Sequence, residues 1–276
     1  MFCAVFWNID RMVPRDGVVT LIASLQQQED ADAIALAECS DYTAKAVLRA
    51  LNPGGQSLPF VPVATTSRVQ LLLRGSAVGT QEVDSHEYYS IFDVQRSVGS
   101  SLLLVVAHMV SQVDKTPSHI DKELIALATA IRTREDKVGH ARTVLIGDLN
   151  ANPFADGVVD AIGLHGIMSR TVAARGKRKA SHRTYPFFFN PMWRFFGDGT
   201  SRPAGTCYYE PEGDHTGYYW NIFDQVLLRP SLLPYYTDDS VRVVDAIAGT
   251  KLTDAEWIPD RSVSSDHLPI RLRLTC

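Results

Sequence analysis

The chain has 276 residues, of which 45% are apolar and 21% charged, and its formal net charge at pH 7 is −4. This composition is typical of a globular protein, and no window approaches the roughly 18 uninterrupted apolar residues of a membrane span, so no membrane interaction is expected. The four cysteines form neither a C-x-x-C pair nor a zinc-binding spacing, which argues against a disulfide-rich scaffold and favours a reducing, cytoplasmic setting.

The first half of the chain alternates strand-like apolar runs with segments of helical spacing. The pattern predicts a buried strand at residues 2–9, a helix at residues 17–28 and the next strand at residues 33–37. A second helix, from about residue 43, is expected to end at residue 51, because an Asn-Pro-Gly-Gly sequence follows. Three shorter β-like runs come next, around residues 69–73, 88–94 and 102–107.

The second half contains the clearest helix pattern, at residues 118–134, where apolar side chains recur at helical spacing. A buried strand is predicted at residues 143–146, and further strands at residues 220–228 and 268–274. No internal repeat, low-complexity tract or linker divides the chain. We therefore expect a single domain spanning residues 1–276.

Residues 170–214 lack regular patterning and are interpreted as a basic-aromatic insert. Residues 168–203 contain eight basic side chains and a single acid, Asp198. The net charge of this segment is therefore +7, and that of the remainder of the chain is −11. Basic side chains can bind phosphates while aromatic rings stack on bases. The alternatives are a solvated basic loop and aromatic rings that only anchor the loop to the core. The expected substrate contacts are Arg175, Lys177, Arg178, Lys179, Trp193 and Arg194.

Polar side chains follow or interrupt several of the predicted strands. A lone Asp or Asn after a strand is usually a turn former or a helix cap, and a lone His is usually structural. Asp224 is harder to dismiss in this way, because its apolar neighbours predict a buried carboxylate that needs a cation, a histidine or several donors beside it. The full set is Asn8, Asp10, Glu38, His108, Asp148, Asn150, Asp224, Asp266 and His267.

These residues occur in an ordered set of motifs: W-N-x-D, a strand-end Glu, a strand-end His, G-D-x-N, an aspartate in the penultimate strand, and a terminal S-D-H-x-P. The set resembles the endonuclease/exonuclease/phosphatase superfamily, which includes deoxyribonuclease I-like nucleases and AP endonucleases. The resemblance spans residues 7 to 269. It implies a four-layer α/β sandwich, with two mixed β-sheets packed face to face and helices on both outer faces.

The resemblance also implies residue roles and a cofactor. Asn8, Asp10, Glu38 and Asp266 form the metal-binding group, and their oxygen atoms suit Mg²⁺ or Mn²⁺. Asp148 orients or deprotonates the attacking water, and Asn150 donates to phosphate oxygens. The remaining catalytic residues are His267 at the scissile phosphate, Asp224 as the group that holds its other ring nitrogen, and His108 as a second histidine.

The function that follows is divalent-metal-dependent phosphodiester hydrolysis, and the partner expected is a nucleic acid substrate, DNA with RNA as an option. The main alternative is a phosphatase or phosphodiesterase acting on a small phosphorylated molecule, which the negative net charge favours. A third reading is an inactive binding module on the same fold, but such a module should have lost at least one motif residue, and none is missing. No obligate protein partner can be inferred.

Overall fold

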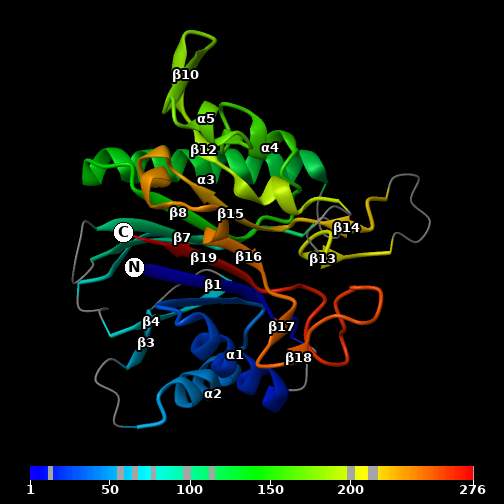
Figure 1. The fold of residues 1–276 in the computed structure, drawn as a ribbon. Coiled ribbons are helices and arrows are strands. Elements are labelled where there is room, and N and C mark those ends of the chain that lie inside the picture. Colours follow the sequence, from blue (N-terminus) through cyan, green and yellow to red (C-terminus); the bar gives the residue numbers. More distant parts are fainter. Residues whose placement is uncertain are drawn as a thin grey trace.

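A computed structural model describes residues 1–11, 15–54, 59–63, 68–75, 79–95, 101–111, 116–197, 203–210 and 217–275. Two large β-sheets lie face to face at the centre of the molecule, and helices cover the outer face of each (Figure 1). The predicted four-layer α/β sandwich is therefore confirmed. Among the described helices, none combines the length and the apolar character needed to cross a bilayer.

The first sheet contains six strands within the described residues, and its centre is formed by the two ends of the chain. The first strand pairs in parallel with β2 and antiparallel with the last strand, β19. In sheet order the strands are β16 (Val241–Val243), β19 (Ile270–Leu274), β1 (Phe2–Asn8), β2 (Ala33–Ala37), β4 (Val69–Arg74) and β3 (Phe60–Val63).

The second sheet contains seven strands within the same described ranges. Its central strand, β8, pairs in parallel with β7 and antiparallel with β15. In sheet order the strands are β5 (Gln81–His86), β6 (Tyr89–Val94), β7 (Leu102–His108), β8 (Thr143–Asp148), β15 (Asp224–Leu228), β12 (Phe188–Phe189) and β9 (Gly166–Ile167).

Alternation along β1 explains how the layers stack. Ala4 and Phe6 point into the core between the two sheets, while Val5 and Trp7 point to the other face, where α1 (Arg15–Glu29) and α2 (Asp41–Leu51) pack. The outer face of the second sheet is covered by α3 (Pro117–Val138), whose buried residues include the apolar residues of the predicted helical pattern. Pro117 in its first turn and Gly139, at φ 73°, mark its two ends.

The expected absence of regular structure in residues 170–214 is wrong for the described part of that segment; residues 198–202 and 211–214 lie outside the described residues. Elements of two to five residues are too short to leave a hydrophobic period. The aromatic side chains Phe187, Phe189 and Phe195 lie in the core, as the anchoring alternative predicts. Besides β12, the elements here are α5 (Arg170–Ala173), β10 (Lys177–Ala180), β11 (Arg183–Pro186), η1 (Pro191–Phe195) and β13 (Cys207–Tyr208).

The strand predicted at residues 220–228 is two strands, β14 (Trp220–Asn221) and β15. The chain is diverted between them because the Asn152 side chain accepts the backbone N–H of Ile222, and the Phe223 carbonyl accepts the N–H of Leu149. The remaining short elements are α4 (Asp156–Val159), η2 (Pro230–Tyr235), η3 (Asp238–Ser240), β17 (Ala246–Ile247) and β18 (Thr250–Lys251).

Candidate active site

Strand register places three of the predicted residues in one row across the strand ends at one end of the second sheet. His108 closes β7 and pairs in register with Asp148, which closes β8; Asp224, at the start of β15, pairs with Asp148 on its other side. Gly147 allows β7 and β8 to approach closely here, because a Cβ at this position would lie 2.1 Å from the Ala107 carbonyl oxygen.

The first sheet delivers the other predicted residues to the same place. Asn8 and Ala37 end the parallel strands β1 and β2 in register, so that Asp10 and Glu38 leave from adjacent strand ends. Because β19 runs antiparallel to β1, its start lies beside the end of β1. Asp266 and His267, which precede β19, therefore lie at the same end of the sheet. Ser265 fixes this approach by donating its hydroxyl to the Asn8 carbonyl, at 2.7 Å.

The two rows meet across the sandwich. Each of three contacts joins a side chain of the first sheet or its flanking loops to one of the second sheet, so the site exists only when both sheets are packed. Two of them are hydrogen bonds, in which Asn8 Nδ2 donates to Asp148 Oδ2 at 3.1 Å and His267 Nδ1 donates to Asp224 Oδ2 at 2.8 Å. The third is the approach of His108 Nε2 to Glu38 Oε1, at 3.8 Å.

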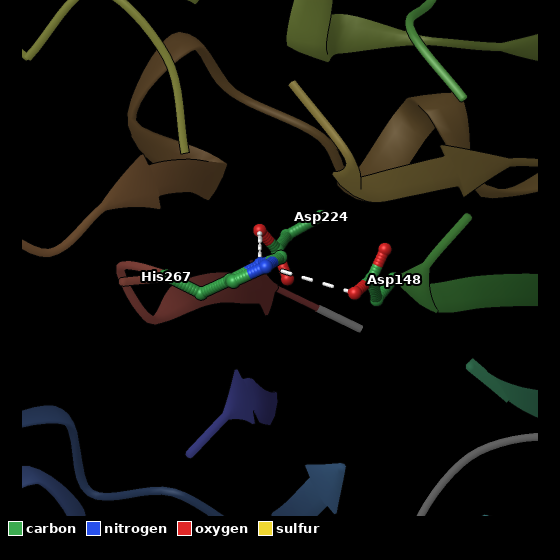
Figure 2. Close-up of side chains that lie close together, drawn as sticks. All are labelled: Asp148, Asp224 and His267. Atoms are coloured by element: carbon green, nitrogen blue, oxygen red, sulfur yellow. Dashed lines mark hydrogen bonds and ion pairs between the residues drawn. The ribbon is translucent and has the colours of Figure 1, made fainter. Parts of the chain in front are cut away.

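Asp224 and His267 form a buried, hydrogen-bonded pair that points toward Asp148 (Figure 2). Burial raises the pKa of Asp224 to about 6, against the opposing attraction of His267. Burial alone would lower the pKa of His267, but the Asp224 carboxylate and its hydrogen bond outweigh that effect, so the pKa lies well above 6.5. The imidazole is therefore held as a cation at neutral pH, with Nδ1 committed to Asp224.

Asp148 is fully buried and accepts from two asparagines. Its Oδ2 receives the Asn8 amide, and its Oδ1 receives the backbone N–H of Asn150 at 2.8 Å. Oδ2 also lies 3.9 Å from both His108 Nε2 and His267 Nδ1. The Asn150 side chain donates an N–H to the Met109 carbonyl at 3.0 Å.

Three predicted site residues adopt left-handed backbone conformations although none is glycine. The φ angles are 41° at Asp10, 52° at Glu38 and 48° at Asn150, each just after the end of a different strand. Such conformations cost about 1–3 kcal/mol and cluster at functional sites.

The donor atoms around Glu38 suit a hard divalent cation. Asp10 and Glu38 both line a cavity of about 160 Å³, together with the hydroxyl-bearing Ser40 and Thr43. The carboxylates of Glu38 and Asp266 are partly exposed, which leaves room for the waters that Mg²⁺ retains. Asn8 already uses both polar atoms of its amide, one on Asp148 and the other on the N–H of Asp10.

A second grouping within 4.8 Å consists of Asp148, Asp224 and His267. Its shortest distance, 2.8 Å, is the hydrogen bond between His267 Nδ1 and Asp224 Oδ2. We therefore describe this grouping as an acid–imidazole pair beside a carboxylate. His108 differs from His267, because burial lowers its pKa against the attraction of Asp148 and Glu38, and it is neutral at pH 7.

The residues predicted to contact substrate are dispersed. Arg175 and the hairpin β10–β11 are exposed, and the hairpin projects from the top of the molecule, beyond α5 (Figure 1). Within it, Arg178 donates to His165 at 2.9 Å while Lys177 and Lys179 face solvent. Arg194 binds the backbone carbonyls of Asp238 and Val241. Trp193 is half-buried, with its ring 6.3 Å from that of Phe154.

The structure adds residues that sequence reasoning did not identify. Arg261 binds Asp10 and Asp266, the Thr206 hydroxyl accepts the backbone N–H of Asp224, and Cys207 forms an antiparallel bridge with His267. Burial raises the pKa of the Cys207 thiol. None of the three stands in a motif, and no local pattern distinguishes them.

The chain is similar to known proteins in sequence and in fold. The model of a family described as Endonuclease/Exonuclease/phosphatase family matches residues 5–267. No curated protein sequence matches the chain. Among solved structures, D. rerio TDP2 complexed with single strand DNA product is 16% identical, with 98% of this chain and 97% of that chain covered and a TM-score of 0.57.

Two further solved structures have the same fold. The human Nocturnin catalytic domain with bound sulfate anion is 13% identical, with 98% of this chain and 93% of that chain covered and a TM-score of 0.54. An AP endonuclease from Archaeoglobus fulgidus is 11% identical, with 100% of each chain covered and a TM-score of 0.57. At these identities the likeness establishes the fold alone.

Proposed function

This chain belongs to the Endonuclease/Exonuclease/phosphatase family. From that premise we propose that it is a Mg²⁺- or Mn²⁺-dependent phosphodiesterase that cleaves nucleic acid. DNA is the substrate we expect, and RNA is the alternative polymer. The observation that carries the proposal is the joining of the two sheets through Asn8–Asp148 and Asp224–His267. The cytoplasmic location and the single-domain organisation stay predictions.

The proposed chemistry uses His267 as a cationic hydrogen-bond donor. Hydrolysis of a phosphodiester develops negative charge on the non-bridging oxygens and on the leaving oxygen. Since Asp224 occupies Nδ1, the ring nitrogen Nε2 is the atom to place at the phosphate. A bound divalent ion supplies further charge stabilisation, with Glu38, Asp10 and Asp266 as the groups to hold it.

Asp148 is the group we assign to the attacking water. It is an acceptor at the centre of the site, and the two asparagines that donate to it hold its carboxylate in one orientation. Asn8 is therefore better suited to positioning Asp148 and Asp10 than to direct metal ligation. Asn150, whose backbone N–H binds Asp148, is the group we assign as a donor to phosphate oxygens.

A cluster of aromatic rings supports a substrate that carries bases. Phe154 follows the G-D-L-N motif closely in the chain and lies 5.3 Å from Tyr218, 5.6 Å from Phe196 and 6.3 Å from Trp193, measured between ring centroids. Phe196 and Tyr218 are 37% and 55% exposed. Exposed rings beside a phosphoesterase site can stack on successive bases of a single strand.

The small-molecule alternative is favoured by a different observation. The basic hairpin β10–β11 projects away from the body of the sandwich, and the predicted site residues include five acids. A phosphatase or phosphodiesterase acting on a small phosphorylated molecule does not need an extended basic surface. This reading keeps the same catalytic residues and changes only the substrate.

The experiment that tests the proposal is cleavage of labelled single-stranded DNA, duplex DNA, RNA and a panel of small phosphate esters, each with Mg²⁺ or Mn²⁺ and each with EDTA. We expect metal-dependent cleavage of at least one polymer. Release of phosphate from small esters without any polymer cleavage would instead support the alternative. No hydrolysis of any substrate with either metal would contradict both readings.

The aromatic cluster leads to a prediction about substrate affinity. Phe154→Ala should raise KM for a single-stranded oligonucleotide roughly tenfold while kcat changes little, because one stacked base contributes about 1–3 kcal/mol of binding. Steady-state kinetics on a single-stranded substrate measure this split. An unchanged KM would remove the cluster from the substrate path.

The matched comparison is the double variant Lys177→Ala, Lys179→Ala, which tests the sequence-based prediction for the hairpin. If these side chains contact phosphates, the variant should lower the slope of log KM against log salt by about 1.4, since each single-strand phosphate contact contributes about 0.7. An unchanged slope would assign the hairpin no part in binding.

A further inference from the structure

A buried glutamine lies directly behind the row of catalytic groups on the second sheet. Gln225 follows Asp224 in β15, and side chains alternate along a strand, so the two point to opposite faces of the sheet. Asp224 points to His267. Gln225 is as fully buried as Asp224, but on the face that Leu227 presents to the apolar cluster around α3. Its hydrogen bonds go to main-chain and amide groups.

Every polar atom of the Gln225 amide has a partner. Nε2 donates to the Ala151 carbonyl at 2.6 Å and to the Ile222 carbonyl at 3.1 Å, and Oε1 accepts the Asn190 amide at 2.7 Å. The two carbonyls can only accept, so they fix which end of the Gln225 amide is the nitrogen. A buried amide with all its hydrogen bonds made has one orientation, and it therefore holds its partners in place.

The shortest of these contacts holds the loop of the G-D-L-N motif. Ala151 follows Asn150, whose φ is 48° and whose backbone N–H binds Asp148 Oδ1 at 2.8 Å. Asparagine tolerates a left-handed conformation better than most residues, but this conformation still costs free energy. It persists only where the surrounding structure holds it. A hydrogen bond at the next carbonyl along the chain is such a restraint.

Other hydrogen bonds tie the same loop to the bend that precedes β15. Before Asn150, the N–H of Leu149 binds a carbonyl of this bend at 2.7 Å, and after it the Asn152 side chain accepts an N–H of the bend at 2.9 Å. Gln225 adds the bond between these two. Because Ala151 comes directly after the strained residue, the bond from Gln225 is the one that opposes its relaxation most directly.

We propose that Gln225 is a positioning residue, which acts on catalysis by holding Asn150 in its left-handed conformation. Without this bond the loop relaxes toward an ordinary φ at Asn150, and the N–H of Asn150 turns away from Asp148. The carboxylate assigned to the attacking water then loses one of the two asparagine donors that orient it. The inference rests on the proposed function and adds to it a residue that acts only through another.

The test compares Gln225→Met with the wild type, on the substrate that the wild type hydrolyses best among labelled DNA, RNA and small phosphate esters. Methionine has nearly the same shape but no amide, so the bond to Ala151 is lost. We expect kcat to fall roughly 10- to 100-fold with little change in KM, because small displacements of catalytic groups cost about this much. The alkaline limb of the pH–rate profile should not move, since the Asp224–His267 pair stays intact.

A second background separates positioning from a general loss of packing. Glycine adopts left-handed conformations at little cost, so Asn150→Gly removes the strain that Gln225 holds. This substitution itself lowers kcat, because Asn150 is assigned to phosphate oxygens. Adding Gln225→Met to Asn150→Gly should lower kcat by less than about threefold more, since effects that act through one residue are not additive. A purely structural role would give the same fold loss in both backgrounds.

Asn190→Ala is the matched control. It removes another buried partner of the same amide, on the side away from the G-D-L-N loop, and leaves the bond to Ala151 in place. Its kcat should stay close to the wild-type value, although its stability falls. Thermal unfolding shows which variants are folded. Gln225→Asn, whose amide is one methylene too short to reach Ala151, replaces Gln225→Met if methionine prevents folding.

The outcomes separate this inference from the proposed function. The role of Gln225 would be overturned, with metal-dependent hydrolysis intact, by an unchanged kcat in Gln225→Met, by an equal loss in the Asn150→Gly background, or by a similar loss in Asn190→Ala. A shift of the alkaline limb would also overturn it, because Gln225 would then act through its neighbour Asp224. No hydrolysis of any substrate by the wild type would overturn the proposed function, and the inference with it.

Discussion

Substitution of His267 by alanine is expected to lower kcat/KM for phosphodiester hydrolysis by about 10²–10⁴-fold while the fold is retained. The imidazole is the cationic group of the proposed mechanism, held by a 2.8 Å hydrogen bond to the buried Asp224. Alanine removes the donor at the phosphate and leaves an unpaired carboxylate in the site. The measurement is hydrolysis of the preferred substrate under saturating Mg²⁺ or Mn²⁺.

The control for this substitution is His119→Ala. His119 is on α3, its side chain is 39% exposed, and it lies 3.7 Å from Glu123 on the same helix. The loss of this histidine should leave hydrolysis within about twofold, since exposed pairs of this kind contribute little. Normal turnover by His267→Ala would reject the catalytic assignment. A large loss in His119→Ala would show that the assay does not isolate the site.

The same pair predicts how the rate depends on pH. The rate should fall below about pH 6, where Asp224 gains a proton and no longer holds the imidazolium. It should fall again at a pH well above 6.5, where His267, whose pKa is raised, loses its proton. In Asp224→Asn the alkaline limb should move to lower pH, because the carboxylate that raises the pKa of His267 is gone. An alkaline limb that does not move would assign it to another group.

The largest effect on stability is expected for Arg229→Ala, at about 3–5 kcal/mol of unfolding free energy. Arg229 is 2% exposed and joins β15 to α3 through two hydrogen bonds to Glu135, at 2.8 and 3.0 Å. It also donates to the Phe187 carbonyl and lies 3.8 Å above the ring of Phe188. Truncation leaves Glu135 as a buried charge without its partner.

Chemical denaturation with urea measures this change, and Arg134→Ala provides the matched comparison. Arg134 precedes Glu135 on the same helix and pairs with Asp84 at 3.1 Å, but both members of this pair are partly exposed. Its removal should change the unfolding free energy by about 0–1 kcal/mol. Equal decreases of the unfolding free energy in the two variants would contradict the view that burial makes the Arg229–Glu135 pair important for stability.

Much of the fold follows from local patterns in the sequence. Buried strands such as β1 and β2 leave continuous apolar runs, and α3 leaves a helical period, so the existence and order of these elements were predictable. The motifs at the strand ends, and their resemblance to one superfamily, were enough to predict the sandwich. Elements of two to five residues between β9 and β15 leave no such period, and they were missed.

The candidate catalytic residues were also identified in the sequence, because each follows, precedes or interrupts an apolar run. Which of them touch was decided by the tertiary structure. Asn8 and Asp148 are 140 residues apart, and Asp224 and His267 are 43 apart, so their contacts depend on the packing of two sheets. Arg261 and Asp10 are separated by 251 residues.

The physical reason is the range over which each effect acts. Burial and chain conformation act between near neighbours, so periodicity and turn residues record them locally. Electrostatic pairing acts through space, and a carboxylate such as Asp10 can take any cation that folding brings to it. The sequence by itself therefore determined the elements and the chemical groups, and the packing of the two sheets alone decided that Arg261 lies on Asp10 and Asp266 while Glu38 remains open.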